Sequence, residues 1–205
     1  MANRKKIIII TPIVVILLIM AILIIMMSGS SNNDISPLVR ADEQELSGRR
    51  LDISFSYDKV KIIASSQFAF WIEDMDGNYV DTLYVTQWTS QGGYRRRPTS
   101  ISQWVAAAQP ANMQQSEIDI ISGATPSPGD YFVSWNFTDR NGNFVTGTQY
   151  RYFIEATMNF NEHVVFTGII SIDESLSYNP TPIFNPPDTK FHNMITNVRV
   201  AYLSN

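Results

Sequence analysis

Residues 68–86, FAFWIEDMDGNYVDTLYVT, decide the class of fold that the chain is expected to adopt. Two runs rich in aromatic and β-branched residues, Phe68 to Glu73 and Tyr79 to Thr86, flank the polar segment 74–78. Such runs favour β-strands, and a short Asp-, Asn- and Gly-rich segment between them favours a tight turn in which Gly77 takes a positive φ. The stretch therefore predicts an antiparallel β-hairpin.

A second stretch repeats this pattern further along the chain. Tyr131 to Phe137 and Phe144 to Ala156 flank Asp139-Arg140-Asn141-Gly142-Asn143, as the first pair of runs flanks Asp74-Met75-Asp76-Gly77-Asn78. The repetition predicts a second, related hairpin. A calcium-binding loop is the alternative reading of these acidic turns, but the EF-hand spacing is incomplete and its distal Glu is missing.

Alternation of apolar and polar residues predicts strands in the rest of the chain as well. Beyond the two hairpins, strands are expected at Leu51 to Tyr57 with a continuation at Val60 to Ala64, at His163 to Ile172 and at Phe191 to Leu203. Thr99 or Ser100 can cap a helix that runs through Gln109 and packs over one open end of the sheets. The predicted fold class is all-β: an immunoglobulin-like β-sandwich with one short helix.

The N-terminal part of the sequence predicts a membrane anchor. At 7–27 all residues but two are Ile, Val, Leu, Met or Ala, and a helix of that length reaches about 30 Å, the thickness of a bilayer core. A Lys- and Arg-containing tail at 1–6 precedes this run, so the tail is expected in the cytoplasm and the rest of the chain outside it. A polar linker is expected at 28–50 and an extracytoplasmic domain at 51–205. A cleaved signal peptide ending near Ser28 is the alternative.

The composition excludes several kinds of chemistry. The chain has 205 residues, no cysteine and a formal net charge of −4, which excludes thiol nucleophiles and iron–sulfur clusters and argues against a nucleic-acid partner. His163 and His192 lack the spacing of metal ligands, and no serine lies in a Gly-x-Ser-x-Gly motif. Asp173 and Glu174 are adjacent, so on a strand they would point to opposite faces. We expect no metal site and no residues that would make the chain a self-sufficient enzyme.

One motif points to a cofactor. Asp119-Ile120-Ile121-Ser122-Gly123-Ala124-Thr125-Pro126-Ser127 resembles the covalent flavinylation motif of extracytoplasmic FMN-binding domains. In those families a flavin transferase joins FMN through a phosphoester to the hydroxyl that matches Thr125. The resemblance implies a cofactor site formed by Asp119, Ser122, Gly123, Ala124 and Thr125. The basic run Arg95 to Arg97 could neutralise the phosphate.

The surroundings of this motif depart from the usual pattern. In FMN-binding domains a helix typically follows the motif, and its N-terminus helps to bind the phosphate. Here Pro126, Pro128 and Gly129 forbid a helix and lead towards the strand expected at Tyr131. Small residues followed by Pro-Gly are also what a turn before a strand requires. A turn without a cofactor is therefore the alternative reading of residues 122–129.

Several short groups of residues between Leu51 and Ala156 carry a broader resemblance: Phe70-Trp71-Ile72-Glu73, Asp76-Gly77, Trp104, Ser122-Gly123-Ala124-Thr125, Pro128-Gly129, Trp135 and Tyr150. This arrangement resembles the bacterial "predicted periplasmic protein" domain of unknown function. Members of that family are exported, and its genes are associated with flavin transferases and membrane redox proteins, which the resemblance implies as partners. The latter half also resembles the immunoglobulin-like modules of secreted and flagellar hook-capping proteins.

Two functions follow from these observations. The first is a membrane-anchored electron carrier with FMN attached at Thr125. The second is an immunoglobulin-like binding or assembly module of the cell envelope that carries no cofactor. A hydrolase has no supporting residues. Among the tryptophans, Trp71, Trp104 and Trp135 are expected in the core. Trp88 could be buried or exposed.

Overall fold

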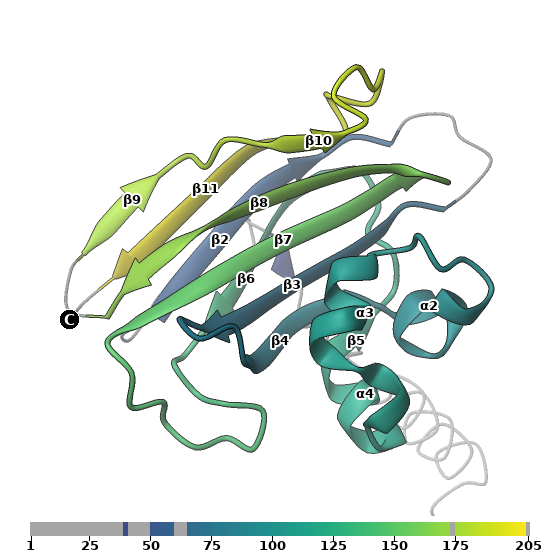
Figure 1. Cartoon of the computed structure of the whole chain (residues 1–205). Coiled ribbons are helices and arrows are strands. Elements are labelled where there is room, and N and C mark those ends of the chain that lie inside the picture. The colour runs from purple at the N-terminus through teal and green to yellow at the C-terminus, as the bar shows by residue number, and fades with distance from the viewer. Residues whose placement is uncertain (1–38, 41–49, 60–64, 173–174, 204–205) are drawn as a thin grey trace, which may run out of the picture. The chain divides into compact units, whose positions relative to one another are not determined.

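The computed structural model describes residues 39–40, 50–59, 65–172 and 175–203 (Figure 1). The chain divides into two compact units, Met1–Ile35 and Ser36–Asn205. The predicted membrane span at 7–27, the tail at 1–6 and the strand continuation at Val60 to Ala64 lie outside the described residues, as do Asp173 and Glu174. Within the described part, no helix combines the length and the apolar character that a membrane crossing requires.

Two β-sheets form the body of the second unit. The five-stranded sheet has the order β1 (Val39–Arg40), β6 (Gly129–Trp135), β2 (Arg50–Tyr57), β11 (Ile195–Leu203) and β9 (Leu176–Tyr178). The six-stranded sheet has the order β10 (Ile183–Asn185), β8 (Glu162–Ser171), β7 (Gln149–Asn159), β3 (Gln67–Asp74), β4 (Tyr79–Thr86) and β5 (Ser122–Gly123). These two sheets confirm the prediction of an all-β sandwich. Val39–Arg40, inside the range expected as linker, pair with β6.

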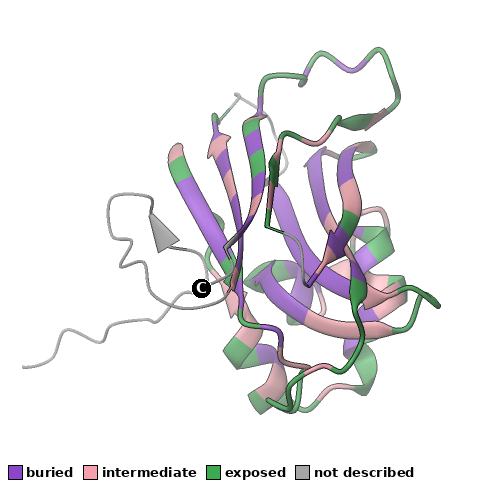
Figure 2. Cartoon of the chain, turned by 90° about the vertical axis from the view of Figure 1, so that its left-hand side faces the viewer, coloured by how far each residue is buried: buried purple, intermediate pink, exposed green. Residues whose placement is uncertain are grey.

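The main core lies between the two sheets. Leu51, Ile53 and Phe55 of β2 face the inner side, and Phe68 and Phe70 of β3 face them from the other sheet; each is at most 2% exposed. Buried and less buried residues alternate along β11, as expected when side chains point to opposite faces in turn, whereas β3 is buried continuously from Gln67 to Ile72 (Figure 2). The phenyl rings of Phe55 and Phe70 lie 5.1 Å apart across this core.

Short helices cover the outer face of the six-stranded sheet over β3, β4 and β5. Figure 1 shows α3 and α4 lying beside β3, β4 and β5. The helical segments are α2 (Gln87–Ser90), η2 (Gly93–Arg95), α3 (Ser102–Ala108), η3 (Pro110–Asn112) and α4 (Gln115–Ile121). The prediction of one short helix is therefore wrong. So is its position at an open end of the sheets, because Trp104 of α3 packs on Trp71 and Val85 of the outer face in a second core.

The first predicted hairpin is confirmed, and the second is confirmed only beside its turn, where Thr138 pairs antiparallel with Phe144. β3 and β4 pair antiparallel around a turn in which Gly77 has φ 85°. The second turn has the same internal bonds, since one Asp139 oxygen accepts from the backbone N–H of Asn141 and of Asn143. However, β6 and β7 belong to different sheets. The turn lies in a crossing between the sheets because both flanks bury aromatic side chains, Trp135 and Tyr150, in the shared core.

Helix α3 begins differently from its prediction. Ser100 donates or accepts a 2.9 Å bond with Thr89, and Thr99 donates to the carbonyl of Phe160, so neither hydroxyl caps the helix. The carboxylate of Glu155, on β7, accepts from the backbone N–H of Trp104 at 3.0 Å and from that of Gln103. A side chain from the sheet thus satisfies the first N–H groups of the helix.

Glu155 makes the stability of the fold depend on pH. Burial raises the pKa of this carboxyl to about 7, and bonds from the backbone of Trp104 and Gln103 oppose that rise. Between the ordinary pKa of 4.5 and about 7, the folded chain keeps a proton that the unfolded chain has released, so this carboxyl lowers stability as pH rises through that window. The raised pKa of Asp81 also makes the stability fall as pH rises. The lowered pKa of His163 makes the stability increase as pH rises.

We predict that Glu155→Gln flattens this dependence, because glutamine keeps an oxygen for the helix N–H groups but does not titrate. The difference in slope is at most about 1.4 kcal/mol per pH unit between the two chains. Chemical denaturation at a series of pH values measures it, and the contributions of Asp81 and His163 cancel in the comparison. Parallel profiles of the two chains would contradict the prediction.

Candidate functional site

The flavinylation-like motif spans the end of a helix and the start of a sheet-edge strand. Asp119 is an exposed residue of α4 and accepts a 2.7 Å bond from the Gln115 amide. Ser122 and Gly123 form β5, which runs parallel to β4 opposite Val85 and Thr86. Sequence reasoning missed α4, because its capping box begins with Gln114 rather than with the Ser or Thr that marks such a box in a sequence. Because α4 ends immediately before β5, Asp119 lies on the helix, Ser122 and Gly123 lie on the strand, and Ala124 and Thr125 lie in the irregular segment that follows.

Thr125 lies in an exposed segment that is held on both sides. Ala124 and Thr125 are exposed. The hydroxyl of Tyr84 donates to the carbonyl of Ala124 at 2.6 Å, and the hydroxyl of Tyr131 donates to the carbonyl of Ser127 at 2.8 Å. Burial and the neighbouring Tyr131 raise the pKa of Tyr84, which keeps that hydroxyl protonated as a donor. The segment therefore presents its side chains from a backbone with fixed attachment points.

The hydroxyl of Thr125 is only weakly engaged. It donates to the carbonyl of Ser66 at 3.5 Å, the outer limit of a hydrogen bond. No helix follows the segment, since residues 124–128 form no regular element and β6 begins at Gly129. The expectation from the prolines is confirmed, so a phosphate here would have no helix N-terminus after the motif.

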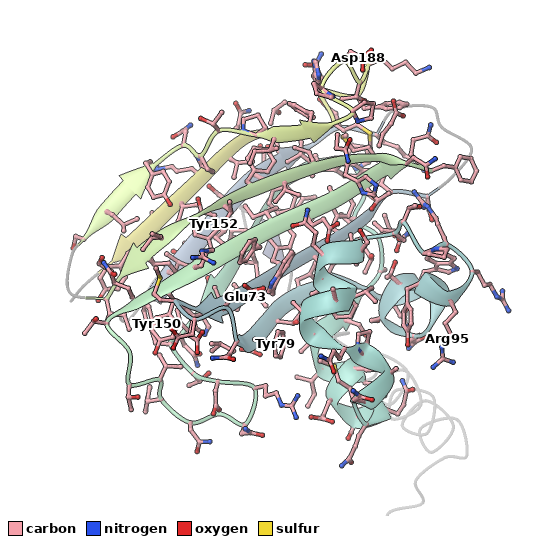
Figure 3. All side chains as sticks on the ribbon, in the orientation of Figure 1. Glu73, Tyr79, Arg95, Tyr150, Tyr152 and Asp188 are labelled. Carbon is pink, nitrogen blue, oxygen red and sulfur yellow. The ribbon has the colours of Figure 1, made fainter. Side chains whose placement is uncertain are left out.

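The three arginines of the basic run have different roles. The guanidinium of Arg97 donates to the carbonyls of Ser65 and Asn159, both at 2.8 Å, and therefore ties the η2 segment to the sheets. Arg95 and Arg96 are exposed and line a cavity of about 500 Å³ beside Trp88, which is 41% exposed. Arg95 is labelled beside the helices in Figure 3. Arg95 and Arg96 are therefore the exposed arginines of the run, whereas the Arg97 guanidinium is bonded to backbone carbonyls at the ends of the strands.

A second cavity, of about 330 Å³, includes Ile120 and Ile121 of the motif in its lining. Its lining comes from β4, α4, the end of β6 and the turn that follows β6. The apolar part is formed by Leu83, Met113, Ile120, Ile121 and Trp135, and the polar part by Asp81, Glu117, Ser134, Asn136, Asp139 and Arg140. This is the size at which small-molecule pockets begin. Sequence reasoning did not find it, because its walls come from four separated segments.

Asp81 is the least solvated carboxyl of this second cavity. Burial and the nearby Asp139 raise the pKa of Asp81 to about 7, against a bond from the backbone N–H of Thr82 at 2.8 Å. Asp139 itself accepts the bonds of its turn, which lower its pKa. Glu117 and Arg140 face each other at 3.8 Å and are both partly exposed. The cavity therefore offers a poorly hydrated carboxyl beside an apolar wall.

The two histidines and the three buried tryptophans make contacts with neighbouring side chains of the fold. His163 Nδ1 is 3.3 Å from the hydroxyl of Thr157, and the ring of His192 packs on Phe184 with centroids 4.4 Å apart. Across the described ranges, no group of three or more His, Asp or Glu side chains is arranged to hold a metal ion. Trp71, Trp104 and Trp135 are at most 1% exposed, which confirms their predicted place in the core.

We predict that Tyr84→Phe loosens the motif segment. The change removes one hydrogen bond from a largely buried donor, at a cost of about 0.5–1.5 kcal/mol, and leaves the ring packing intact. Tyr131→Phe should act at the other end of the segment. Hydrogen exchange read at the peptide covering residues 122–129 should become faster in each variant and fastest in the double variant. Unchanged exchange in that peptide would show that the two hydroxyls do not hold it.

Comparison with known proteins gives one family. The family model described as "predicted periplasmic protein" matches residues 50–181, which include β2 to β9, the motif and both cavities. Searches of the curated proteins and of the solved structures found no match. Since the match covers more than half of the 205 residues, the chain belongs to this family of predicted periplasmic proteins, DUF2271.

Proposed function

We propose that the chain is a membrane-anchored electron carrier whose FMN is attached through a phosphoester to Thr125, outside the cytoplasm. The observation that carries this proposal is the exposed, weakly bonded hydroxyl of Thr125 in a segment whose backbone is held by Tyr84 and Tyr131. The family's description as periplasmic agrees with a location in which a diffusible cofactor would be lost and a covalent one retained.

The attachment chemistry needs a nucleophile that an enzyme can reach. The oxygen of Thr125 would form the new bond to the FMN phosphorus, while the pyrophosphate bond of a flavin dinucleotide breaks and the nucleoside monophosphate leaves. The hydroxyl proton passes to a base of the transferase. Gly123 and Ala124 carry little or no side chain beside Thr125, which keeps the approach to its oxygen open. A separate flavin transferase is therefore one partner in the proposal.

The neighbouring residues suit a phosphate ester. α2 contacts β5, so the turn that carries Arg95 and Arg96 lies at the same end of the sheet edge as the motif. Their two exposed guanidinium groups would lower the local electrostatic cost of the phosphate charge. Ser122 would contribute a hydroxyl from β5. When bound, the flavin supplies the electron-transfer chemistry that the side chains of this chain lack.

The remaining parts of the proposal concern location and electron partners. The apolar run at 7–27 would hold the N-terminus in the cytoplasm and the β-sandwich outside the membrane as a single-pass protein. Membrane redox proteins would then exchange electrons with the flavin at the membrane surface.

Mass spectrometry of the intact chain tests the attachment. After co-production with a flavin transferase in an exporting host, we expect a mass increase of one FMN and flavin fluorescence that survives denaturing electrophoresis. Thr125→Ala should lose both signals, whereas Thr125→Ser should keep them because it retains a hydroxyl. Ser116→Ala removes another exposed hydroxyl, on α4, and should have no effect. An unmodified mass in the wild-type chain would overturn the proposed function.

A cofactor-free binding module of the cell envelope is the second candidate. Phe144, in the loop between β6 and β7, is 80% exposed, and exposed aromatic side chains are frequent contact residues in protein interfaces. If this candidate holds, the chain stays unmodified under the conditions above and Phe144→Ser abolishes capture of an envelope protein. Capture that does not depend on Phe144 would contradict it.

A further inference from the structure

The cavity of about 330 Å³ beside the motif differs in character from the one beside Trp88. Its lining combines apolar residues, among them Leu83, Ile121 and Trp135, with polar ones that include Asp81 and Asn136. A flat heteroaromatic ring with one hydrocarbon edge and one polar edge needs this combination. The other cavity is lined by glycines, arginines and Gln91 around the single ring of Trp88, so it offers little apolar surface.

The edge of the six-stranded sheet is open where this cavity lies. In the described residues, β5 covers only Val85 and Thr86 of β4, and the cavity begins at Leu83 and extends to Tyr79. The β3–β4 register shifts between Phe70 and Trp71, whose partners are Tyr84 and Thr82, so Leu83 is a bulged residue. Bulges bend the strand and redirect side chains, and they are frequent beside functional sites. Ile120 and Ile121 of helix α4 line the cavity beside this open edge.

The attachment point is within reach of this cavity. Thr125 follows the lining residue Ile121 by four positions, so their Cα atoms are at most about 14 Å apart. The arm between the attachment oxygen and the ring of FMN has eight single bonds of about 1.5 Å and spans roughly 10 Å when extended. The arm, the threonine side chain and the ring itself cover the separation between Thr125 and Ile121, which lies on the α4 side of the cavity.

We propose that this cavity, between β4, α4 and the end of β6, is the docking site for the isoalloxazine ring of the FMN carried at Thr125. The ring lies against Leu83, Ile121 and Trp135, and its pyrimidine edge meets Asp81 and Asn136. The carboxylate of Asp81 accepts from the ring N–H, and the Asn136 amide donates to a ring carbonyl. This inference rests on the proposed attachment at Thr125.

Accessibility of the flavin to a soluble quencher tests the docking. In full-length chain with one FMN confirmed by intact mass, iodide should quench flavin fluorescence about three- to tenfold less than in free FMN, because such pockets bury 70–90% of a ligand. Asn136→Trp places a large side chain in the cavity from an exposed position and should restore the accessibility of free FMN. Trp88→Leu alters the other cavity and should leave the quenching as in wild type.

Asp81→Asn provides a second measurement that does not depend on filling the cavity. Above the pKa of about 7 the carboxylate adds negative charge beside the ring, which disfavours the more negative reduced form. The variant should therefore have a more positive midpoint potential at pH 8, with Glu162→Gln as a control carboxylate on β8.

The outcomes separate the two proposals. A chain with FMN on Thr125 whose flavin is as accessible as free FMN, or whose accessibility responds to Trp88→Leu and not to Asn136→Trp, overturns the docking site alone. An unchanged potential in Asp81→Asn overturns the contact with Asp81. A chain without FMN overturns the attachment, and the docking site with it.

Discussion

Burial of β3 and β4 on both of their faces fixes the position of the other elements around them. The inner face of β3 lies on the aromatic core between the sheets, and its outer face lies under α3 through Trp71, Val85 and Trp104. A strand covered on both sides cannot shift its register by one residue without exposing one apolar set and crowding the other. β3 and its neighbour β4 are therefore held in one register, and the motif segment is positioned against a fixed edge.

Hydrogen bonds from buried polar groups tie the helical layer to this sheet. Glu155 satisfies the first turn of α3, and the indole N–H of Trp104 donates to the Thr82 hydroxyl at 2.8 Å. Thr82 is the immediate neighbour of Asp81, so the packing of α3 on the outer face also positions the carboxyl at the open edge of β4. The candidate site thus depends on residues that do not line it.

The flavinylation-like motif lies between a helix and an edge strand. It joins a short helix to a two-residue parallel edge strand and is then held through Tyr84 and Tyr131 as the chain enters the other sheet. In FMN-binding domains a helix typically follows the motif. In this chain the hydroxyls of Tyr84 and Tyr131 hold the backbone of the segment instead. The segment therefore combines an accessible hydroxyl with a backbone that costs little entropy to order.

The sequence by itself determined the elements whose signals are local. Alternation at Leu51 to Tyr57, the turn at Gly77 and the prolines after Thr125 each depend on neighbouring residues, and the structure has these features as predicted. The same local reasoning predicted the turn at Asp139 and the pairing beside it correctly, but not the placement of β6 and β7 in different sheets. That placement, the capping of α3 by Glu155 and the cavity around Asp81 are visible only in the folded structure. The physical reason is that these features join residues far apart in the chain, whose contacts are selected by competition for the shared core and leave no periodic pattern in the sequence.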